Sequence, residues 1–269
     1  FTNQKEYYAY YDDNDSLCYN LPTYDGKLLY SYACSNELRF STKTRSGIGT
    51  ICHEFSHVLG LPDYYITNTQ YSNFEKFTPG AWSLMGYGNY LNDGNTPPNF
   101  SIYDKYYLGW VEPQVLNANG TYTLPADGQA GYLLARNEMH LDARACRTDT
   151  VYYIENRQLT GWDEYLPGHG MLVWRVMYDE DKWASNSPND FKTRYRLMCA
   201  DEDATPYTVY QPRQDVPFPG LTAQTQFAPF SVNQLDSIQE DISGLITFSF
   251  KTENKTPVDN ITIPSVSAT

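Results

Sequence analysis

The sequence predicts an α+β protein in which a helical part precedes a β-rich part. Ahead of residue 110, two segments carry apolar residues at helical spacing. Beyond residue 111, short strand-like segments alternate with turn residues such as glycine, proline and asparagine. We therefore expect a helix-bearing core at residues 1–110, a mostly antiparallel β-rich region packed on it at 111–250, and a linker-like tail at 251–269.

The composition is that of a folded, acidic protein. Of its 269 residues, 41% are hydrophobic and 16% aromatic, which is enough to form a sizeable core. The formal net charge of −13 argues against nucleic acid as a partner, because the average surface would repel phosphate groups. No run of about 18 apolar residues is present, so we expect no membrane span. The oligomeric state is left open.

The first helix is predicted between residues 47 and 60. Ahead of it we expect only short strands, at residues 7–11 and 27–33, with Asp25-Gly26 as a turn before the second. Within the helix, apolar residues recur at helical spacing up to Leu59. Gly60 suits the left-handed position after a last helical turn, and a proline follows two residues later. The helix should therefore end at Leu59 or Gly60, and the chain should turn sharply there.

The remaining elements are predicted from turn residues and from strand-like alternation of side chains. Residues 64–100 have poor periodicity and are predicted to form a long ordered loop. A second helix is expected at residues 101–108, closed by Gly109. The expected strands are residues 121–124, 132–135, 150–156, 170–176, 195–200 and 245–250.

One segment of the first helix has the spacing of a metal site. In the run His53-Glu54-Phe55-Ser56-His57, the two histidines are four residues apart, so a helix projects both imidazoles from one face. That spacing suits two nitrogen ligands on one zinc ion, and Glu54 is placed to act as a general base without binding the metal. Asp63 lies six residues after His57, beyond the Gly60 turn, and can complete the site. Only four histidines occur in the chain, so two buried structural histidines in this pattern are the weaker interpretation.

A second motif lies about 20 residues further on. The run Ser83-Leu84-Met85-Gly86-Tyr87 has the pattern of a methionine turn, a tight loop that lays an apolar thioether beneath a zinc site. Ordinary core packing is the alternative for Met85.

Together these motifs resemble those of the metzincin zinc peptidases. More narrowly, the stretch from His53 to Tyr65 is similar to the immune inhibitor A family of secreted bacterial proteases, with further likeness across residues 47–180, including residues 101–113, 153–158 and 166–174. The resemblance implies a metzincin-like catalytic core with an active-site helix and a methionine turn. Metzincins carry a larger subdomain before the zinc helix, so we expect the N-terminal part of this core to be short or truncated.

The resemblance also implies a mechanism. His53, His57 and Asp63 would hold Zn²⁺, and Glu54 would take a proton from the zinc-activated water. By analogy, Tyr87 is the candidate donor to the oxyanion, against the alternative of a packed tyrosine. Relatives tend to have histidine where this chain has Arg175, so the role of that position is open.

Three acidic runs outside this motif are candidates for a structural Ca²⁺ site. Carboxylate oxygens suit a hard cation, but solvated surface charge is the stronger interpretation. Glu155 and Arg157, on one predicted strand, are expected to form a buried pair that supports the fold. The acidic runs are Asp12, Asp13 and Asp15; Asp179-Glu180-Asp181; and Asp201-Glu202-Asp203.

The leading hypothesis is a secreted zinc metalloendopeptidase, a hydrolase that acts on protein or peptide substrates. One alternative is an extracellular binding or adhesion module with a retained protease fold and little turnover; another is a zinc hydrolase of non-peptide amides. The intact His53, Glu54 and His57 argue against the first alternative. The chain starts at Phe1 and shows no export signal, so we expect a mature form. Because the family that it resembles is exported, and because an unspecific endopeptidase endangers the cell that makes it, we expect the protein to work outside the cytoplasm, secreted, at the cell surface or in the periplasm.

Overall fold

The computed structural model describes residues 2–3, 9–11, 14, 17–19, 23–28, 31–39, 42–136, 150–201 and 213–252. The predicted acidic loop at Asp12, Asp13 and Asp15 and most of the predicted tail lie outside these residues. Within them, helices gather in the first half and two larger sheets in the second, so the α+β prediction is confirmed. The boundary between the two regions near residue 110 stays a prediction. No helix in the described part of the chain combines the length and apolar character needed to cross a membrane.

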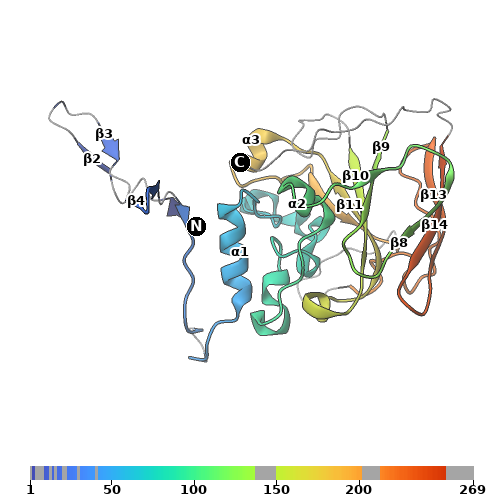
Figure 1. Cartoon of the computed structure of the whole chain (residues 1–269), viewed down its shortest axis with the longest axis horizontal. Coiled ribbons are helices and arrows are strands. Elements are labelled where there is room, and N and C mark those ends of the chain that lie inside the picture. Colours follow the sequence, from blue (N-terminus) through green and yellow to red (C-terminus); the bar gives the residue numbers. More distant parts are fainter. Residues whose placement is uncertain are drawn as a thin grey trace.

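Short hairpins precede the first helix and lie on its far side from the two larger sheets (Figure 1). The predicted turn at Asp25-Gly26 is present: both residues have positive φ, 51° and 75°, as a two-residue hairpin requires. It joins β4 to β5, and β5 and β6 both lie within the second predicted strand. The elements here are β1 (Thr2–Asn3), β2 (Ala9–Tyr11), β3 (Leu17–Tyr19), β4 (Thr23–Tyr24), β5 (Lys27–Leu28) and β6 (Ser31–Tyr32).

The helical part is built on α1 (Ile48–Val58) and α2 (Ile102–Tyr107). Both helices were predicted within two residues of these bounds. The segment between them was predicted to be a loop. It instead contains three 3₁₀ segments: η2 (Thr69–Phe77), η3 (Gly80–Trp82) and η4 (Gly88–Gly94). Such segments have no sustained apolar period, which is why the sequence pattern did not reveal them.

Two sheets form the second half. The first has the strand order β12-β11-β10-β9-β7 and is antiparallel except for the β7–β9 pair; the second has the order β13-β14-β8 and is antiparallel. All six predicted strands are present. The elements here are β7 (Gln114–Val115), β8 (Gly120–Leu124), β9 (Gly131–Ala135), β10 (Val151–Arg157), η5 (Gly161–Asp163), β11 (Gly170–Val176), α3 (Glu180–Ala184), β12 (Tyr195–Met198), β13 (Asn233–Glu240) and β14 (Ile246–Thr252).

The five-stranded sheet is covered on both faces, with the helical part and the three-stranded sheet on opposite sides of it (Figure 1). Side chains of β10 therefore alternate between two cores. Tyr153 joins the cluster that contains Met85 and Ile102, whereas Ile154 joins the cluster that contains Phe248. Burial on both faces explains why every residue of β10 is buried.

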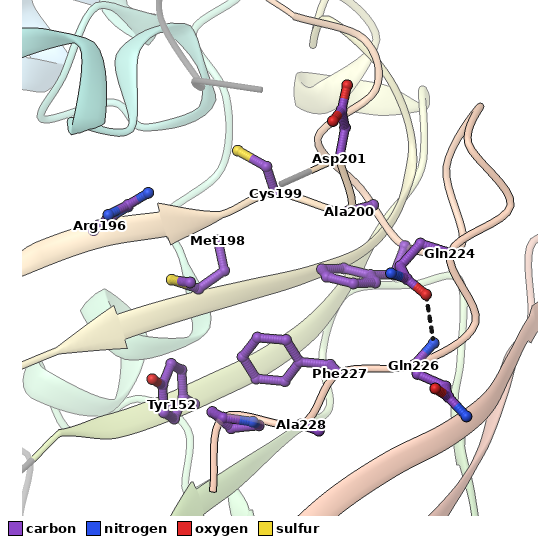
Figure 2. A pocket seen from close by; sticks show the side chains of 12 residues that line it. Tyr152, Arg196, Met198, Cys199, Ala200, Asp201, Gln224, Gln226, Phe227 and Ala228 are labelled. Atoms are coloured by element: carbon purple, nitrogen blue, oxygen red, sulfur yellow. Dashed lines mark hydrogen bonds between the residues drawn. The ribbon is translucent and has the colours of Figure 1, made fainter. Parts of the chain in front are cut away.

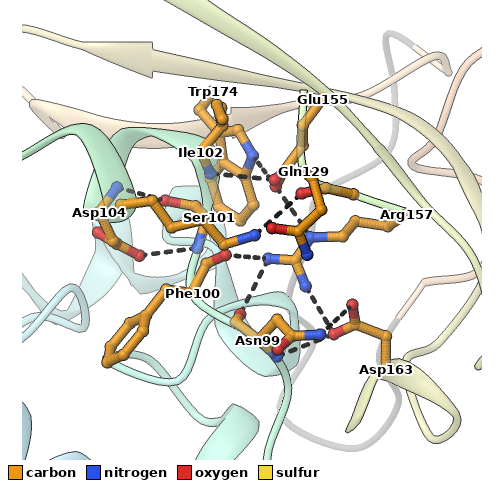
Figure 3. A network of polar contacts seen from close by, with 12 residues as sticks. Asn99, Phe100, Ser101, Ile102, Asp104, Gln129, Glu155, Arg157, Asp163 and Trp174 are labelled. Atoms are coloured by element: carbon orange, nitrogen blue, oxygen red, sulfur yellow. Dashed lines mark hydrogen bonds and ion pairs between the residues drawn. The ribbon is translucent and has the colours of Figure 1, made fainter. Parts of the chain in front are cut away.

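A buried polar network connects the helical part to β10 (Figure 3). The predicted pair is confirmed: Arg157 Nε lies 3.2 Å from Glu155 Oε1, and the two side chains are 1% and 0% exposed. Glu155 also accepts hydrogen bonds from the backbone N–H of Ile102 at 3.0 Å and from Trp174 Nε1 at 2.7 Å. Arg157 donates to Asp163 Oδ1 at 2.6 Å and to two backbone carbonyls just ahead of α2. The network thus fixes α2 against the sheet.

Candidate metal centre

Helix α1 carries the candidate site and packs closely against η4. A Cβ atom on Gly49 would lie 2.0 Å from the carbonyl oxygen of Asn89, so only glycine permits this approach. The imidazole rings of His53 and His57 meet edge to face with centroids 5.0 Å apart. The helical spacing therefore places both rings on one face, as expected.

Backbone carbonyls determine which nitrogen each histidine offers. His53 Nδ1 lies 2.9 Å from the carbonyl oxygen of Leu84, and His57 Nδ1 lies 2.8 Å from that of Leu61. A carbonyl only accepts, so each Nδ1 must carry the proton. In the neutral rings, both Nε2 atoms then present lone pairs, which is the tautomer that binds a metal.

The turn after α1 returns Asp63 to these two nitrogens. Gly60 has a φ of 101°, and the N–H groups of Gly60 and Leu61 bond to the carbonyls of His57 and Ser56, which is the Schellman pattern. Asp63 Oδ1 consequently lies 3.0 Å from His53 Nε2 and 3.3 Å from His57 Nε2. His53, His57 and Asp63 each offer one ligand atom, all within 4.8 Å of one another, and no other such group of three occurs among the described residues.

The donor set fits a cation such as zinc. Asp63 Oδ1 is buried and lacks a well-formed hydrogen bond, although it faces two imidazole nitrogens. Burial alone would raise the pKa of Asp63, but the contacts with the imidazoles of His53 and His57 and the hydrogen bond from Asn186 outweigh burial and hold the pKa well below its usual value. Burial alone would lower the pKa of His53, but Asp63 and the Leu84 carbonyl raise it. Three converging lone pairs require either extra protons on the imidazoles or one cation, and two nitrogens with one carboxylate oxygen are ligands that zinc accepts.

Two asparagines that no sequence motif marked fix this turn. Asn186 Nδ2 donates to Asp63 Oδ2 at 2.6 Å, and Asn186 Oδ1 accepts from the Asp63 backbone N–H at 2.6 Å. Asn189 Nδ2 donates to the carbonyl of Tyr64 at 2.7 Å. Both asparagines follow α3, more than 120 residues beyond the site. The only sequence signal was an asparagine just after a short helix, a common helix end that says nothing about its partner.

The predicted turn around Met85 adjoins these residues. Met85 is fully buried, and its carbonyl accepts from the backbone N–H of Tyr64 at 2.7 Å, next to the Leu84 carbonyl that binds His53. The turn therefore holds both α1 and the segment that carries Asp63. Tyr87, the predicted oxyanion donor, is half-buried; its ring lies 5.7 Å from that of Tyr65, and its side chain interacts with the Glu75 carboxylate.

Glu54 and Tyr65 border the candidate metal position. Glu54 is half-buried, and its charge is close enough to His53 and Tyr65 to raise the pKa of both. The Tyr65 ring stacks on His53 with centroids 6.3 Å apart. Burial, followed by the charge of Asp63, raises the pKa of Tyr65 well above its usual value, so this hydroxyl remains a hydrogen-bond donor at neutral pH.

Two cavities lie away from these residues. One, of about 350 Å³, is lined by Tyr152, Met198 and Phe227 among others, on the sheet face opposite the helical part (Figure 2). Burial raises the pKa of the Cys199 thiol there to about 12, so this cysteine stays protonated. The other, of about 410 Å³, is mostly apolar and lies between α1 and the segment just before α2, with Phe55 and Trp110 among its lining residues.

The remaining sequence candidates have structural roles or lie partly outside the description. Asp179 caps α3, accepting from the backbone N–H of Lys182, which is how a solvated acidic run at a helix start behaves. Glu202 and Asp203 lie outside the described residues. Arg175 donates to the backbone carbonyls of Lys192 and Thr193 and so connects β11 to the segment before β12.

Comparison with known proteins agrees with this geometry. Residues 40–111 match the immune inhibitor A peptidase M6 catalytic domain. The resemblance inferred from the sequence is confirmed over that segment, which contains α1, Asp63, the turn at Met85 and α2. The match supports a metallopeptidase, a class of hydrolase. No curated protein matches the chain.

Proposed function

We propose that this protein is a zinc-dependent endopeptidase with a metzincin-type site, acting on protein or peptide substrates outside the cytoplasm. The observation that carries the proposal is the convergence of His53 Nε2, His57 Nε2 and Asp63 Oδ1, with Asp63 Oδ1 buried and without a well-formed hydrogen bond. The family match to a peptidase catalytic domain supports the reaction class.

His53, His57 and Asp63 would hold the zinc ion. When bound, zinc supplies Lewis-acid polarisation of the scissile carbonyl and lowers the pKa of water to near neutrality. The Leu84 and Leu61 carbonyls keep each histidine in the tautomer that such a site requires. The turn at Met85 would serve as the methionine turn, since it supplies one of those carbonyls and an apolar floor.

Glu54 would accept the proton of the attacking water and pass it to the leaving amine. It follows His53 directly on α1 and is half-buried beside the candidate metal position. Tyr87 would donate a hydrogen bond to the oxyanion. For that step its hydroxyl must move away from the Glu75 carboxylate, with which its side chain interacts.

The test separates chemistry from folding and metal binding. Glu54→Gln keeps the size of the side chain but removes the proton acceptor, so it should bind one zinc ion per chain yet lose at least about 100-fold in cleavage of an unfolded protein. The matched control is Glu112→Gln, because Glu112 is exposed and lies outside the site. Near-normal proteolysis by Glu54→Gln would show that Glu54 is not the general base. Zinc binding by the unmodified protein without chelator-sensitive proteolysis would favour the binding-module alternative.

A further inference from the structure

The third candidate ligand is held by a residue from the other half of the chain. Asn186 forms two hydrogen bonds with Asp63, donating to Oδ2 at 2.6 Å and accepting from the backbone N–H at 2.6 Å. Because Asn186 occupies Oδ2, only Oδ1 faces the two imidazoles. The amide thus decides which carboxylate oxygen is presented and fixes the backbone that carries it.

The loop after α3 is built to hold Asn186 in this position. Asn186 has a φ of 53°, a left-handed conformation that asparagine tolerates, and its N–H bonds to the carbonyl of Trp183 at 3.2 Å. Trp183 is buried beside Tyr64, with ring centroids 6.5 Å apart. Three residues on, Asn189 Nδ2 donates to the Tyr64 and Tyr195 carbonyls, which connects the same loop to β12.

We propose that Asn186 is the positioning residue that sets the metal affinity of the site, and that metal binding in turn orders the loop at residues 185–189. The proposal rests on the proposed function, since it assumes that Asp63 is a metal ligand. Hydrogen-bond partners of ligands orient them and typically contribute 10- to 100-fold to metal affinity. By linkage, a loop that improves metal binding must itself be stabilised when metal binds.

The test replaces Asn186 by glycine, which accepts the positive φ and removes only the side chain. We expect the zinc dissociation constant, measured by competition with a chromogenic chelator, to rise by about 10- to 100-fold. The control is Asn92→Gly: Asn92 is exposed, has a φ of 48° and donates to Thr96 Oγ1, but has no contact with the site. Its dissociation constant should stay within about twofold of the original.

Hydrogen exchange supplies a readout that does not depend on turnover. Adding zinc to the unmodified protein should slow amide exchange at residues 185–189 as well as at 61–65, and in Asn186→Gly only the second segment should respond. If Asn186→Gly binds zinc as tightly as Asn92→Gly, or if residues 185–189 of the unmodified protein ignore zinc that is bound, the inference is wrong. If the unmodified protein binds no zinc, the proposed function itself fails.

Discussion

Removing the charge of Arg157 should destabilise the fold more than any surface substitution. Arg157→Met keeps the length of the side chain but leaves the carboxylates of Glu155 and Asp163 buried without their cation (Figure 3). Breaking a buried ion pair in this way costs about 3–5 kcal/mol. A domain has only about 5–15 kcal/mol of stability in total, so the variant should unfold at a much lower urea concentration. Trp174, hydrogen-bonded to Glu155, makes tryptophan fluorescence a direct probe.

An exposed pair provides the control for this experiment. Arg39 Nη1 lies 3.4 Å from Asp93 Oδ1, but the Asp93 side chain is 86% exposed, so Arg39→Met should cost less than about 1 kcal/mol. In the double variant Glu155→Gln, Arg157→Met, the cost should fall well below the sum of the two single changes, because no buried charge of that pair remains unpaired. A cost below about 1 kcal/mol for Arg157→Met would show that the buried network contributes no more to stability than an exposed pair.

Two further predictions concern α2. Burial raises the pKa of Asp104 from 3.8 to about 6, against its hydrogen bonds from Tyr64 and Ser101. Above pH 6 the folded protein holds an ionised buried carboxyl, which lowers its stability, and protonation removes this penalty as the pH falls through 6. Between pH 8 and 5, the free energy of unfolding of the unmodified protein, measured in urea, should therefore rise by about 1–2 kcal/mol relative to that of Asp104→Asn. If the difference in the free energy of unfolding between the two proteins stays the same from pH 8 to 5, the pKa of Asp104 is not raised. Ser101→Ala removes a capping box and the contact with the Tyr195 hydroxyl at 2.8 Å, and should cost about 1–2 kcal/mol in the same assay; no measurable loss would show that the cap is dispensable.

Local patterns predicted the parts of the fold that depend on neighbours in sequence. The end of α1 followed from Gly60, whose positive φ the structure shows, and β10 and β11 followed from alternation and apolar runs. Strand β13 was missed for a physical reason. Its buried residues Leu235 and Ile238 are three apart because a bulge at Ser237 breaks the two-residue period.

In the candidate site too, contacts between sequence neighbours were predicted and contacts between distant residues were not. His53, His57 and Asp63 lie within 11 residues of one another, so helical spacing and one turn were enough to bring them together. Asn186 was beyond reach because its partner lies 123 residues away, and only tertiary packing brings the two together. The role of Tyr87 depends on its interaction with Glu75, twelve residues earlier in an irregular segment, which no periodic pattern describes.

A crystal structure grown with zinc would show whether α1 and the turn after it form a zinc site. An anomalous difference map at the zinc edge should show one strong peak bonded to His53 Nε2, His57 Nε2 and one oxygen of Asp63, at about 2.0–2.2 Å. The other Asp63 oxygen should keep its hydrogen bond from Asn186. A map without a peak between these three side chains would rule out the zinc site, and a map with Asp63 turned away from the metal would rule out Asp63 as the third ligand.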